Sequence, residues 1–503
     1  MVCGGCMAIV VGIDIGTQST KAICYDTDLK QIAASAQAPH ALNSRDDGTR
    51  EQLASWWIDA IAACFKNLPD WIKSQSVAIG VSGQQHGFVP VDAHGNVLYP
   101  VKLWNDTSTA PECDELTALC GGSSALLGQE GNLILPGYTA SKILWFRKNH
   151  RDLYDRMAKI LLPHDYVNYF LTGAYTMEYG DASGTGLLDI RTRTWSTRLL
   201  RALDSERDLA DALPGLIEAH QCAGTLKTDT ARLLGLPSGI VVSSGGGDNM
   251  MGAIGTGTVS DGTLTMSLGT SGTLFGASGK PIIDPKGRLA AFCSSTGAWL
   301  PLLCTMNCTV ASEVSRSLFK KGVKEFDACA MSAPIGCEGV VMLPYFNGER
   351  TPNYPKGKGC LMGFTLENMT EANISRSAME SAIFGLKSGL EAFQELGFSA
   401  RGIRLIGGGA KSPLWRQMVA DVCDLPVSIP SITEAAALGA ALQGWWAYCQ
   451  SKGQEISIEK IVQDHVQLDS GATCLPEAQS VSLYRQAYDR YLTYATAVRP
   501  LFS

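Results

Sequence analysis

The sequence predicts an α/β protein made of two domains. Runs typical of strands alternate with runs typical of helices in both halves of the chain, as they do where helices cover a sheet. The chain has 503 residues, which is more than one ordinary core supports, so two domains are expected. Each half also contains a predicted hairpin whose turn begins Gly-Thr and is rich in small residues, at 16–19 and 269–272.

The first half begins with a predicted hairpin at residues 8–26, where two β-rich runs flank the small polar turn. Residues 53–65 carry apolar side chains at helical spacing, and residues 77–81 are typical of a short buried strand. A second hairpin is expected between strands at 88–91 and 97–99. Three further elements are predicted in this half: helices at 140–149 and 164–171 and a strand at 240–243.

The second half repeats this alternation of strands and helices. It opens with strands at 264–268 and 273–276 around the second Gly-Thr turn. The predicted domain boundary lies near residues 252–260, which gives domains of residues 8–252 and 253–503. The later elements are strands at 339–344 and 403–406 and helices at 370–396, 413–423 and 434–448.

The composition excludes several classes of function. With 41 Lys and Arg against 48 Asp and Glu, the formal net charge is −7, so we expect no basic face for nucleic acid and no polybasic membrane anchor. No apolar run approaches the ~20 residues that cross a bilayer. Residues 1–11 are apolar but carry no Lys or Arg, unlike a secretory signal. We therefore expect a cytoplasmic protein without nucleic-acid or membrane partners.

The chain has 16 cysteines, and we expect them to be reduced. Cys24, Cys64 and Cys423 lie in apolar stretches, where cysteine acts as a small buried hydrophobe. Cys3 and Cys6 form one C-x-x-C pair, but no second pair or spaced histidines complete a zinc site. A metal or redox role for that pair is the less favoured alternative.

The two Gly-Thr turns are candidates for phosphate binding. Glycine and small hydroxyl residues expose backbone N–H groups and add hydroxyl donors, which together form an anion-binding concavity. Ordinary hairpin turns have the same composition, which is the alternative for each turn alone. No P-loop or dinucleotide-binding pattern is present. The candidate residues are Gly16, Thr17, Gln18, Ser19, Thr20 and Lys21 in the first turn and Gly269, Thr270 and Ser271 in the second.

Asp14 precedes the first turn and lies between Ile13 and Ile15 on the predicted strand. Strand alternation points its side chain away from those of its two neighbours. A carboxylate there needs a cation, a donor or water. Beside a phosphate turn the expected cation is Mg²⁺, bound through water. The alternative is an aspartate that accepts hydrogen bonds from the amides of the turn.

Two glycine triplets each lead into a predicted helix. Residues 245–247 deliver Asp248 into a first helical turn, where it is either a helix cap or the base of an active site. A helix start also lowers the pKa of an aspartate, which would keep it ionised. The second triplet, at 407–409, lets a flat ligand approach a helix N-terminus, or forms a flexible loop. Its candidate binding residues are Gly408, Gly409, Lys411 and Ser412.

Together these motifs resemble the FGGY family of carbohydrate kinases, within the superfamily of sugar kinases, actin and heat-shock chaperone ATPases. The resemblance runs from about residue 11 to about residue 447, with the motifs in family order. The matching stretches are D-I-G-T-Q-S-T-K at 14–21 and S-L-G-T-S-G at 267–272 for the two phosphate motifs, G-G-G-A-K-S at 407–412 for the adenosine motif, and G-Y-T-A-S-K-I-L-W-F-R-K-N at 137–149 and G-C-L-M-G-F at 359–364 for the signature patterns.

The resemblance implies two ribonuclease-H-like domains, of the actin and sugar-kinase type, that face each other across a cleft. Sugar would bind mainly to the first domain and ATP mainly to the second, with Mg²⁺ as the metal. Asp248 matches the family's catalytic base and would be both cap and base, and Asp14 is expected to act with it. The expected partners are a small-molecule sugar and ATP, with a homodimer as one option for the assembly.

Three stretches are similar to the family members that phosphorylate D-xylulose to D-xylulose 5-phosphate: S-G-Q-Q-H-G at 82–87, L-W-N-D at 103–106 and P-Y-F-N-G-E-R-T-P at 344–352. One departure is visible, because Gln85 stands where many bacterial members have Met. The expected sugar-binding residues are Gln85, His86, Trp104, Asn105, Asp106 and Asn249.

Two alternative functions are kept. One is a kinase for D-ribulose or another ketose or polyol. The other is an assembly ATPase of the actin or chaperone kind, which shares the phosphate turns but needs no sugar-facing base. Asp248, together with Gln85 and His86, argues against that second alternative. Taken singly, His86 could be a loop histidine bonded to backbone, and Trp104 a core residue.

Overall fold

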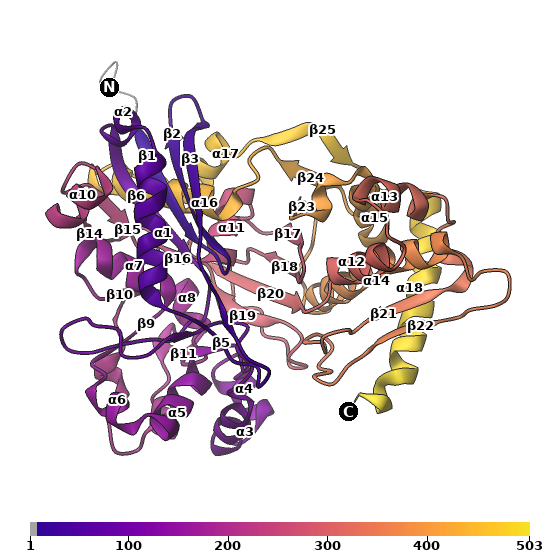
Figure 1. Cartoon of the computed structure of the whole chain (residues 1–503), viewed down its shortest axis with the longest axis horizontal. Coiled ribbons are helices and arrows are strands. Elements are labelled where there is room, and N and C mark those ends of the chain that lie inside the picture. The colour runs from indigo at the N-terminus through magenta and orange to yellow at the C-terminus, as the bar shows by residue number, and fades with distance from the viewer. Residues whose placement is uncertain (1–7, 503) are drawn as a thin grey trace.

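The computed structural model describes residues 8–502 and contains two α/β halves, each built on a seven-stranded sheet (Figure 1). The predicted α/β class is therefore confirmed. Cys3 and Cys6 lie outside the described residues. Cys24, Cys64 and Cys423 are buried free thiols, as predicted.

The two sheets are formed by segments that follow one another along the chain. The strands of the first sheet are β1 (Ile9–Ile15), β2 (Ser19–Asp26), β3 (Gln31–Pro39), β6 (Ser76–Gly83), β14 (Cys222–Thr225), β15 (Val241–Ser243) and β16 (Gly246–Gly247). Those of the second are β17 (Thr263–Leu268), β18 (Gly272–Gly276), β19 (Ala290–Cys293), β20 (Trp299–Thr305), β23 (Gly402–Ile406), β24 (Val427–Pro430) and β25 (Leu468–Cys474).

Both sheets share one core topology. In the first, β3, β2 and β1 pair antiparallel, β6 and β15 continue parallel to β1, and β14 closes the edge antiparallel. In the second, β20, β18, β17, β23, β24 and β25 repeat that order and those directions. The two Gly-Thr turns therefore occupy the same point of the two sheets, between the first and second strands, and both predicted hairpins are confirmed.

Helices cover both faces of the first sheet. One face packs on α1 (Ala54–Asn67), α7 (Pro163–Thr172) and α10 (Thr228–Leu234). The other packs on α11 (Asp248–Thr256), α16 (Ala435–Ser451) and α17 (Ile458–His465). The second sheet shares its main apolar core with α14 (Glu371–Glu395), α15 (Pro413–Cys423) and α18 (Ala478–Val498). The predicted helices are thus confirmed, with small shifts at their ends.

Further elements extend each half. An added region of the first half has its own apolar core, formed by α3 (Ala110–Leu119), α4 (Ser123–Gln129), α5 (Thr139–Asn149), α6 (Arg151–Arg156) and α9 (Thr197–Leu203). The second half adds α12 (Thr309–Leu318), α13 (Val323–Met331) and the hairpin of β21 (Val341–Pro344) and β22 (Gly359–Met362).

The predicted hairpin of residues 88–99 is confirmed, but its ladder is short, with the N–H of Leu98 donating to the carbonyl of Pro90 at 2.9 Å. Strand β7 (Val89–Val91) also pairs with β9 (Lys159–Leu161). The carboxylate of Asp92 accepts hydrogen bonds from the backbone N–H groups of His94 and Asn96, at 2.8 and 2.9 Å. These bonds brace the turn, together with the N–H of Asp92, which donates to the carbonyl of Asn96 at 2.9 Å.

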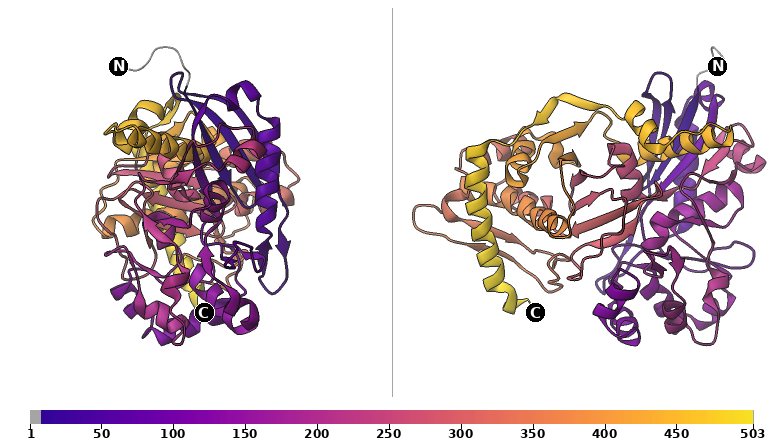
Figure 2. Two further views of the ribbon diagram at one scale, coloured as in Figure 1. Left: turned by 90° about the vertical axis from the view of Figure 1, so that its left-hand side faces the viewer. Right: turned by 180° about the vertical axis from the view of Figure 1, so that it is seen from behind.

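The chain passes between the halves three times. Helix α11 leads from the first sheet to the second, and α16 follows β24 of the second sheet yet packs on β1 and β6 of the first. After α17 the chain returns to the second sheet as β25. Viewed from behind, helices from the orange C-terminal part lie on the indigo half (Figure 2). The predicted boundary between residues 252 and 253 falls inside α11 and stays a prediction. Among residues 8–502, no helix is long and apolar enough to cross a membrane.

The substitution Gly439→Ala tests the contact between α11 and α16. A Cβ at Gly439 would lie 1.8 Å from the carbonyl oxygen of Met251 in α11, so the helices would have to separate. We expect the free energy of unfolding, measured in urea, to fall by ~3 kcal/mol. The control is Gly128→Ala in α4, where no atom lies within 4 Å of the added Cβ and a gain of ~0.5–1 kcal/mol is expected. Equal effects of the two substitutions would contradict the close helix contact.

Candidate active site

A cleft of about 190 Å³ separates the two halves at the level of the Gly-Thr turns. Each half contributes one hairpin to its walls, and α11 and α16 contribute their first turns. The lining residues are Asp14 and Gly16, Ser267, Thr273 and Phe275, Ile406, and Asp248, Asn249, Gly252, Ala435 and Ala436. The two carboxylates predicted to be catalytic thus face one cleft.

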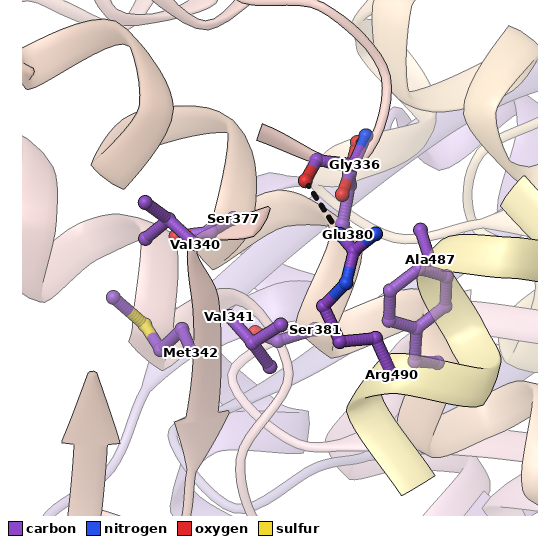
Figure 3. Close-up of a pocket in the computed structure, with 10 residues that line it drawn as sticks. Gly336, Val340, Val341, Met342, Ser377, Glu380, Ser381, Ala487 and Arg490 are labelled. Atoms are coloured by element: carbon purple, nitrogen blue, oxygen red, sulfur yellow. Dashed lines mark hydrogen bonds between the residues drawn. The ribbon is translucent and has the colours of Figure 1, made fainter. Parts of the chain in front are cut away.

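A second cavity lies far from these groups, between β21, α14 and α18 (Figure 3). Glu380 and Arg490 line it, and the carboxylate of Glu380 accepts a hydrogen bond from the N–H of Gly336 at 3.1 Å. Its volume is about 10 Å³, which is room for about one water molecule. This cavity is too small for a substrate, so the chemistry is assigned to the larger cleft.

Asp248 occupies the first position of α11, and this corrects the prediction that it caps the helix. The N-cap is Gly247, which has an extended conformation and belongs to β16. Because β16 pairs with β6, Gly247 stays in the strand ladder and the helix begins at Asp248. Oδ1 of Asp248 instead accepts hydrogen bonds from the backbone N–H and the Nδ2 of Asn249, at 2.8 and 3.0 Å.

The prediction that the helix start keeps the pKa of Asp248 low is also wrong. Burial, followed by the negative charges of Asp14 and Asp181, raises this pKa to about 7. The hydrogen bonds from Asn249 act in the opposite direction but are weaker. A favourable helix terminus is typically worth less than ~1 kcal/mol, whereas desolvation of a buried carboxyl shifts its pKa by several units.

The loop that carries Asp248 is held from two sides. Gly245 has a φ of +74°, and a Cβ there would lie 2.8 Å from Cδ2 of His164. From α7, Nδ2 of Asn168 donates to the carbonyl of Ser244 at 2.8 Å. From α16, the amide of Gln443 accepts from the N–H of Gly245 at 2.9 Å and donates to its carbonyl at 3.0 Å. The direction of the Asp248 side chain is therefore fixed by packed elements.

A buried cluster of charges lies beneath this loop. His164 is placed between Asp165 and Asp181, with N···O distances of 2.9 and 2.7 Å. Although burial opposes it, these two carboxylates raise the pKa of His164 well above its usual range. Burial raises the pKa of Glu178 to about 7, while its carboxylate caps the short helix α8 (Tyr179–Ser183). Two acids and one imidazolium thus sit below Asp248, with Glu178 beside them.

Asp14 points into the cleft, as strand alternation predicts, while Ile13 and Ile15 enter the core on the α1 side. Its Oδ1 accepts a hydrogen bond from the hydroxyl of Ser82 at 2.7 Å. Burial raises its pKa, and the hydrogen bond from Ser82 and the charge of Lys21 act against this. Within residues 8–502, Asp14 forms no ion pair shorter than 4.0 Å, so the carboxylate lacks the cation that burial calls for.

The first turn is shaped by hydrogen bonds to its own backbone and side chains. The N–H of Gly16 donates to the carbonyl of Ser19 at 3.0 Å, and the N–H of His40 donates to the carbonyl of Gln18 at 3.1 Å. The hydroxyl of Thr17 accepts from the indole of Trp104 at 3.0 Å.

The residues that follow the first turn have partners outside it. The hydroxyl of Ser19 accepts from Nε2 of Gln37 at 2.8 Å, and Lys21 forms an ion pair with Glu434 at 3.3 Å. The hydroxyl of Thr20 is buried without a partner within the described chain.

The second Gly-Thr turn lies next to the glycine triplet at 407–409. The carbonyl of Gly269 accepts from the N–H of Thr309 at 3.0 Å, and that of Thr270 accepts from the N–H of Cys308 at 2.9 Å. Gly407 has a φ of +91°, and a Cβ there would lie 2.6 Å from the carbonyl oxygen of Leu268. The remaining predicted residues here are Ser271 in the second turn, Gly408 and Gly409 before α15, the exposed Lys411, and Ser412, which is the N-cap of α15.

Gln85 and His86 form a turn directly after β6. His86 has a φ of +64°, a strained conformation for a residue with a Cβ. Its carbonyl accepts hydrogen bonds from Nζ of Lys142 at 2.7 Å and from the hydroxyl of Thr139 at 3.1 Å. Lys142 is fully buried and also donates to the carbonyl of Gly137 at 2.7 Å, so one ammonium group joins the two segments. Burial lowers the pKa of Lys142 to about 7.

Three polar atoms of this turn and its neighbour are buried without a hydrogen-bond partner in the described chain: Nε2 of Gln85, Nδ1 of His86 and Oδ1 of Asn105. Burial, and then the charges of Lys142 and Arg350, lower the pKa of His86 well below its usual range, so its ring is neutral. Unpartnered buried polar atoms cost free energy unless a ligand or water satisfies them. A polyhydroxylated molecule would supply the missing partners.

The remaining predicted sugar contacts differ in their availability. Nδ2 of Asn249 donates to Oε1 of Gln85 at 2.8 Å and so links α11 to the Gln85 turn. Both oxygens of Asp106 already accept hydrogen bonds, including those from the N–H of Arg50 at 2.8 Å and the hydroxyl of Ser108 at 2.6 Å. Asp106 therefore holds the strand end in place, and its direct contact with a sugar stays a prediction.

Several residues of the site are not found by sequence reasoning. Lys142 gave one signal, a lysine inside a stretch otherwise suited to burial. His164 looked like an ordinary helix residue, because its partner Asp181 comes from another element. Arg350 was part of a matching stretch but had no predicted role.

The comparisons with known proteins agree with this geometry. Residues 9–255 match the N-terminal domain, and residues 264–448 the C-terminal domain, of the FGGY family of carbohydrate kinases. The chain belongs to this family. A xylulose kinase of Haemophilus influenzae is 43% identical over 96% of this chain and 99% of that protein. A xylulose kinase of Escherichia coli is 32% identical over 98% of this chain and all of that protein, 100%.

Solved structures have the same architecture. A xyloylose kinase from Brucella ovis superposes with a TM-score of 0.90 at 31% identity, over 98% of this chain and 100% of that one. A glycerol kinase from Plasmodium falciparum with ADP, at 20% identity and a TM-score of 0.84 over 97% of this chain and 98% of that one, shares the fold. The predicted actin and sugar-kinase type of fold, with two domains facing each other, is confirmed.

The raised pKa of Asp248 predicts an unusual effect on stability. A carboxyl whose pKa is higher in the folded than in the unfolded state takes up a proton on folding, so it destabilises the fold increasingly as pH rises from about 4 to about 7. Asp248→Asn cannot titrate. At pH 8 we expect it to unfold in urea with a free energy higher than wild type by up to ~4 kcal/mol, since three pKa units are worth about that much. At pH 4.5 the difference should shrink to ~1 kcal/mol, because the unfolded carboxyl is then only partly protonated. A difference independent of pH would contradict the raised pKa.

Proposed function

We propose that the protein transfers the γ-phosphoryl group of ATP to D-xylulose and forms D-xylulose 5-phosphate. The family supplies the reaction class, and the relatives named as xylulose kinases support the sugar. The single observation that carries the proposal is the position of Asp248. Its carboxylate has a pKa of about 7 and lies in the cleft between the first Gly-Thr turn and the hairpin of the second half.

Asp248 would act as the general base. Phosphoryl transfer depends mainly on positioning and on stabilising charge, with one carboxylate placed to accept the proton of the attacking hydroxyl. Asn249 holds Oδ1 through two hydrogen bonds, which leaves Oδ2 for the substrate. A base whose pKa lies near the working pH combines ionisation with enough proton affinity to be effective.

The phosphate groups would lie between the two hairpins. Helices α11 and α16 both begin at the cleft, where Asn249 and Ala435 line it, and helix N-termini favour anions. The backbone amides of the turns at Gly16 and Gly269 would add donors. The adenosine would lie beyond them, against Gly408 and Gly409.

The residues present fit a hydrated Mg²⁺. Asp14 is a buried carboxylate with one oxygen engaged by Ser82, and residues 8–502 contain no group of three or more His, Cys, Asp or Glu that would enclose a metal. Mg²⁺ prefers one or two carboxylates together with water and phosphate oxygens. Asp14 would hold it, and when bound it neutralises charge on the phosphates.

The sugar would lie against the turn of Gln85 and His86. The unpartnered Nε2 of Gln85 and Oδ1 of Asn105 offer a donor and an acceptor for hydroxyl groups. The ring of His86 packs between Tyr138 and Phe292, with centroid distances of 4.6 and 5.6 Å, so its orientation is fixed. This polar pocket is what an assembly ATPase would not need.

Removal of the base should abolish turnover without loss of the fold. We expect kcat of Asp248→Asn, per folded molecule, to fall by ~10²–10⁴-fold, the usual share of a general base. The affinity for ATP should be nearly unchanged, because the side chain does not belong to either phosphate turn. Asp229→Asn is the control, because Asp229 also lies in a first helical turn but is exposed. A kcat of Asp248→Asn within threefold of wild type would overturn the role of Asp248.

The choice of sugar is tested separately with coupled ADP release. D-xylulose should exceed D-ribulose and glycerol in kcat/KM by at least about tenfold, which corresponds to ~1.4 kcal/mol of transition-state stabilisation. If D-ribulose or glycerol gives the higher value, the sugar assignment fails and the kinase assignment stands. If no ketose or polyol is phosphorylated, the kinase proposal itself fails.

A further inference from the structure

Arg350 belongs to the second half, and its charge acts on the turn of Gln85 and His86 in the first half. It follows β21 in the loop that leads to β22. A Cβ at Gly137, which belongs to the first half, would lie 3.5 Å from Nη2 of Arg350. The charge of Arg350 contributes, after burial and Lys142, to the lowered pKa of His86. The guanidinium therefore reaches from the second half to the first-half segment that carries Gly137, beside the pocket proposed for the sugar.

The guanidinium has no carboxylate partner. Within residues 8–502, no acidic oxygen lies within 4.0 Å of it, although this group is half-buried. It contacts the thiol of Cys304. Burial raises the pKa of this thiol, and the charge of Arg350 acts against that rise. Arginine carries five N–H donors in a rigid fork, and a thiol is a weak acceptor. Most of its donors are therefore available to another molecule.

The backbone beside Arg350 is fixed to the second half. The buried carboxylate of Glu349 accepts hydrogen bonds from the N–H of Arg350 at 2.8 Å and from Nδ2 of Asn307 at 3.1 Å. Asn307 directly precedes Cys308, whose N–H donates to the carbonyl of Thr270 in the second Gly-Thr turn at 2.9 Å. One connected segment therefore supports both Arg350 and that turn.

The first-half segments beside Arg350, which carry Gly137 and His86, are equally fixed. Gly137 and His86 are joined by Lys142, which donates to both carbonyls at 2.7 Å. Gly137 also has no room for a side chain, since its Cβ would lie 2.2 Å from the carbonyl oxygen of Trp104. A ligand that contacts both Arg350 and these segments would meet groups on fixed backbone from both halves, which lowers the entropic cost of binding.

We propose that Arg350 binds the sugar from the second half, with its guanidinium donating hydrogen bonds to hydroxyl or carbonyl oxygens at the end of the ketose that lies near His86 and Gly137. The sugar then bridges the two halves. Because the segment that carries Arg350 also supports the second phosphate turn, sugar binding and ATP binding favour the same arrangement of the halves and strengthen each other. This inference rests on the proposed sugar kinase activity.

The test compares wild type, Arg350→Met and Arg350→Lys. Loss of hydrogen bonds from a charged donor should raise KM for D-xylulose in Arg350→Met by ~10–100-fold, with the affinity for ATP in the absence of sugar unchanged. Arg350→Lys should recover part of the loss. Calorimetry with a non-hydrolysable ATP analogue should show that D-xylulose strengthens nucleotide binding less in Arg350→Met than in wild type. The control is Arg316→Met, which removes a partly exposed arginine of α12 that is paired with Glu313.

The outcomes separate this inference from the proposed function. If wild type phosphorylates no ketose, the proposed function fails, and the same comparison is made with the best substrate of the panel. If wild type is active and Arg350→Met has a KM for the sugar within twofold of it, the role of Arg350 is overturned. A purely structural role would lower Tm and affect sugar and ATP alike, which also contradicts the inference.

Discussion

The backbone contact between α11 and α16 is the constraint on which the site depends. A Cβ at Gly255 would lie 1.9 Å from the carbonyl oxygen of Ala435, so any side chain there would force the two helices apart. The same holds where α16 lies on the first sheet, because Cβ atoms at Gly12 and Gly80 would lie 2.0 and 1.8 Å from carbonyl oxygens of that helix. The sheet therefore fixes α16, and α16 fixes α11.

This arrangement places two helix starts at one cleft. Asp248 begins α11 and Ala435 begins α16, and both line the cleft with the first Gly-Thr turn. The ion pair between Lys21 and Glu434, at 3.3 Å, joins the strand after that turn to the residue before α16. Since α11 and α16 both pack on the first sheet and contact each other, their two starts keep a fixed position relative to the first Gly-Thr turn. The proposed phosphate site and the proposed base are therefore held by the same packed elements.

The sequence predicts most elements because their signals are local: alternation in β1, helical spacing in α1, and turn residues in both hairpins. The hairpin at 88–99 forms only a short ladder, and the partner strand of β7 is β9, which is distant in sequence and gives no local signal. The motifs identify Asp248 but misjudge its state, because its pKa depends on Asp14 and Asp181 from other elements. The role of Lys142 likewise cannot be predicted from its own helix, which shows only a lysine in a stretch suited to burial, because its partners are carbonyls of other segments.

The buried charges under Asp248 help to raise its pKa, and the same charges cost folding free energy. Carboxylates in a dry interior cost free energy unless they are paired, and here only His164 pairs Asp165 and Asp181. The negative charge of Asp181 that is left to act on Asp248 helps to raise its pKa toward 7. His164 also packs against Gly245. The same side chain therefore offsets the charge of Asp181 and shapes the loop that carries Asp248. The electrostatic state of Asp248, the proposed base, is therefore a property of the packed scaffold, and it is set before any substrate enters the cleft.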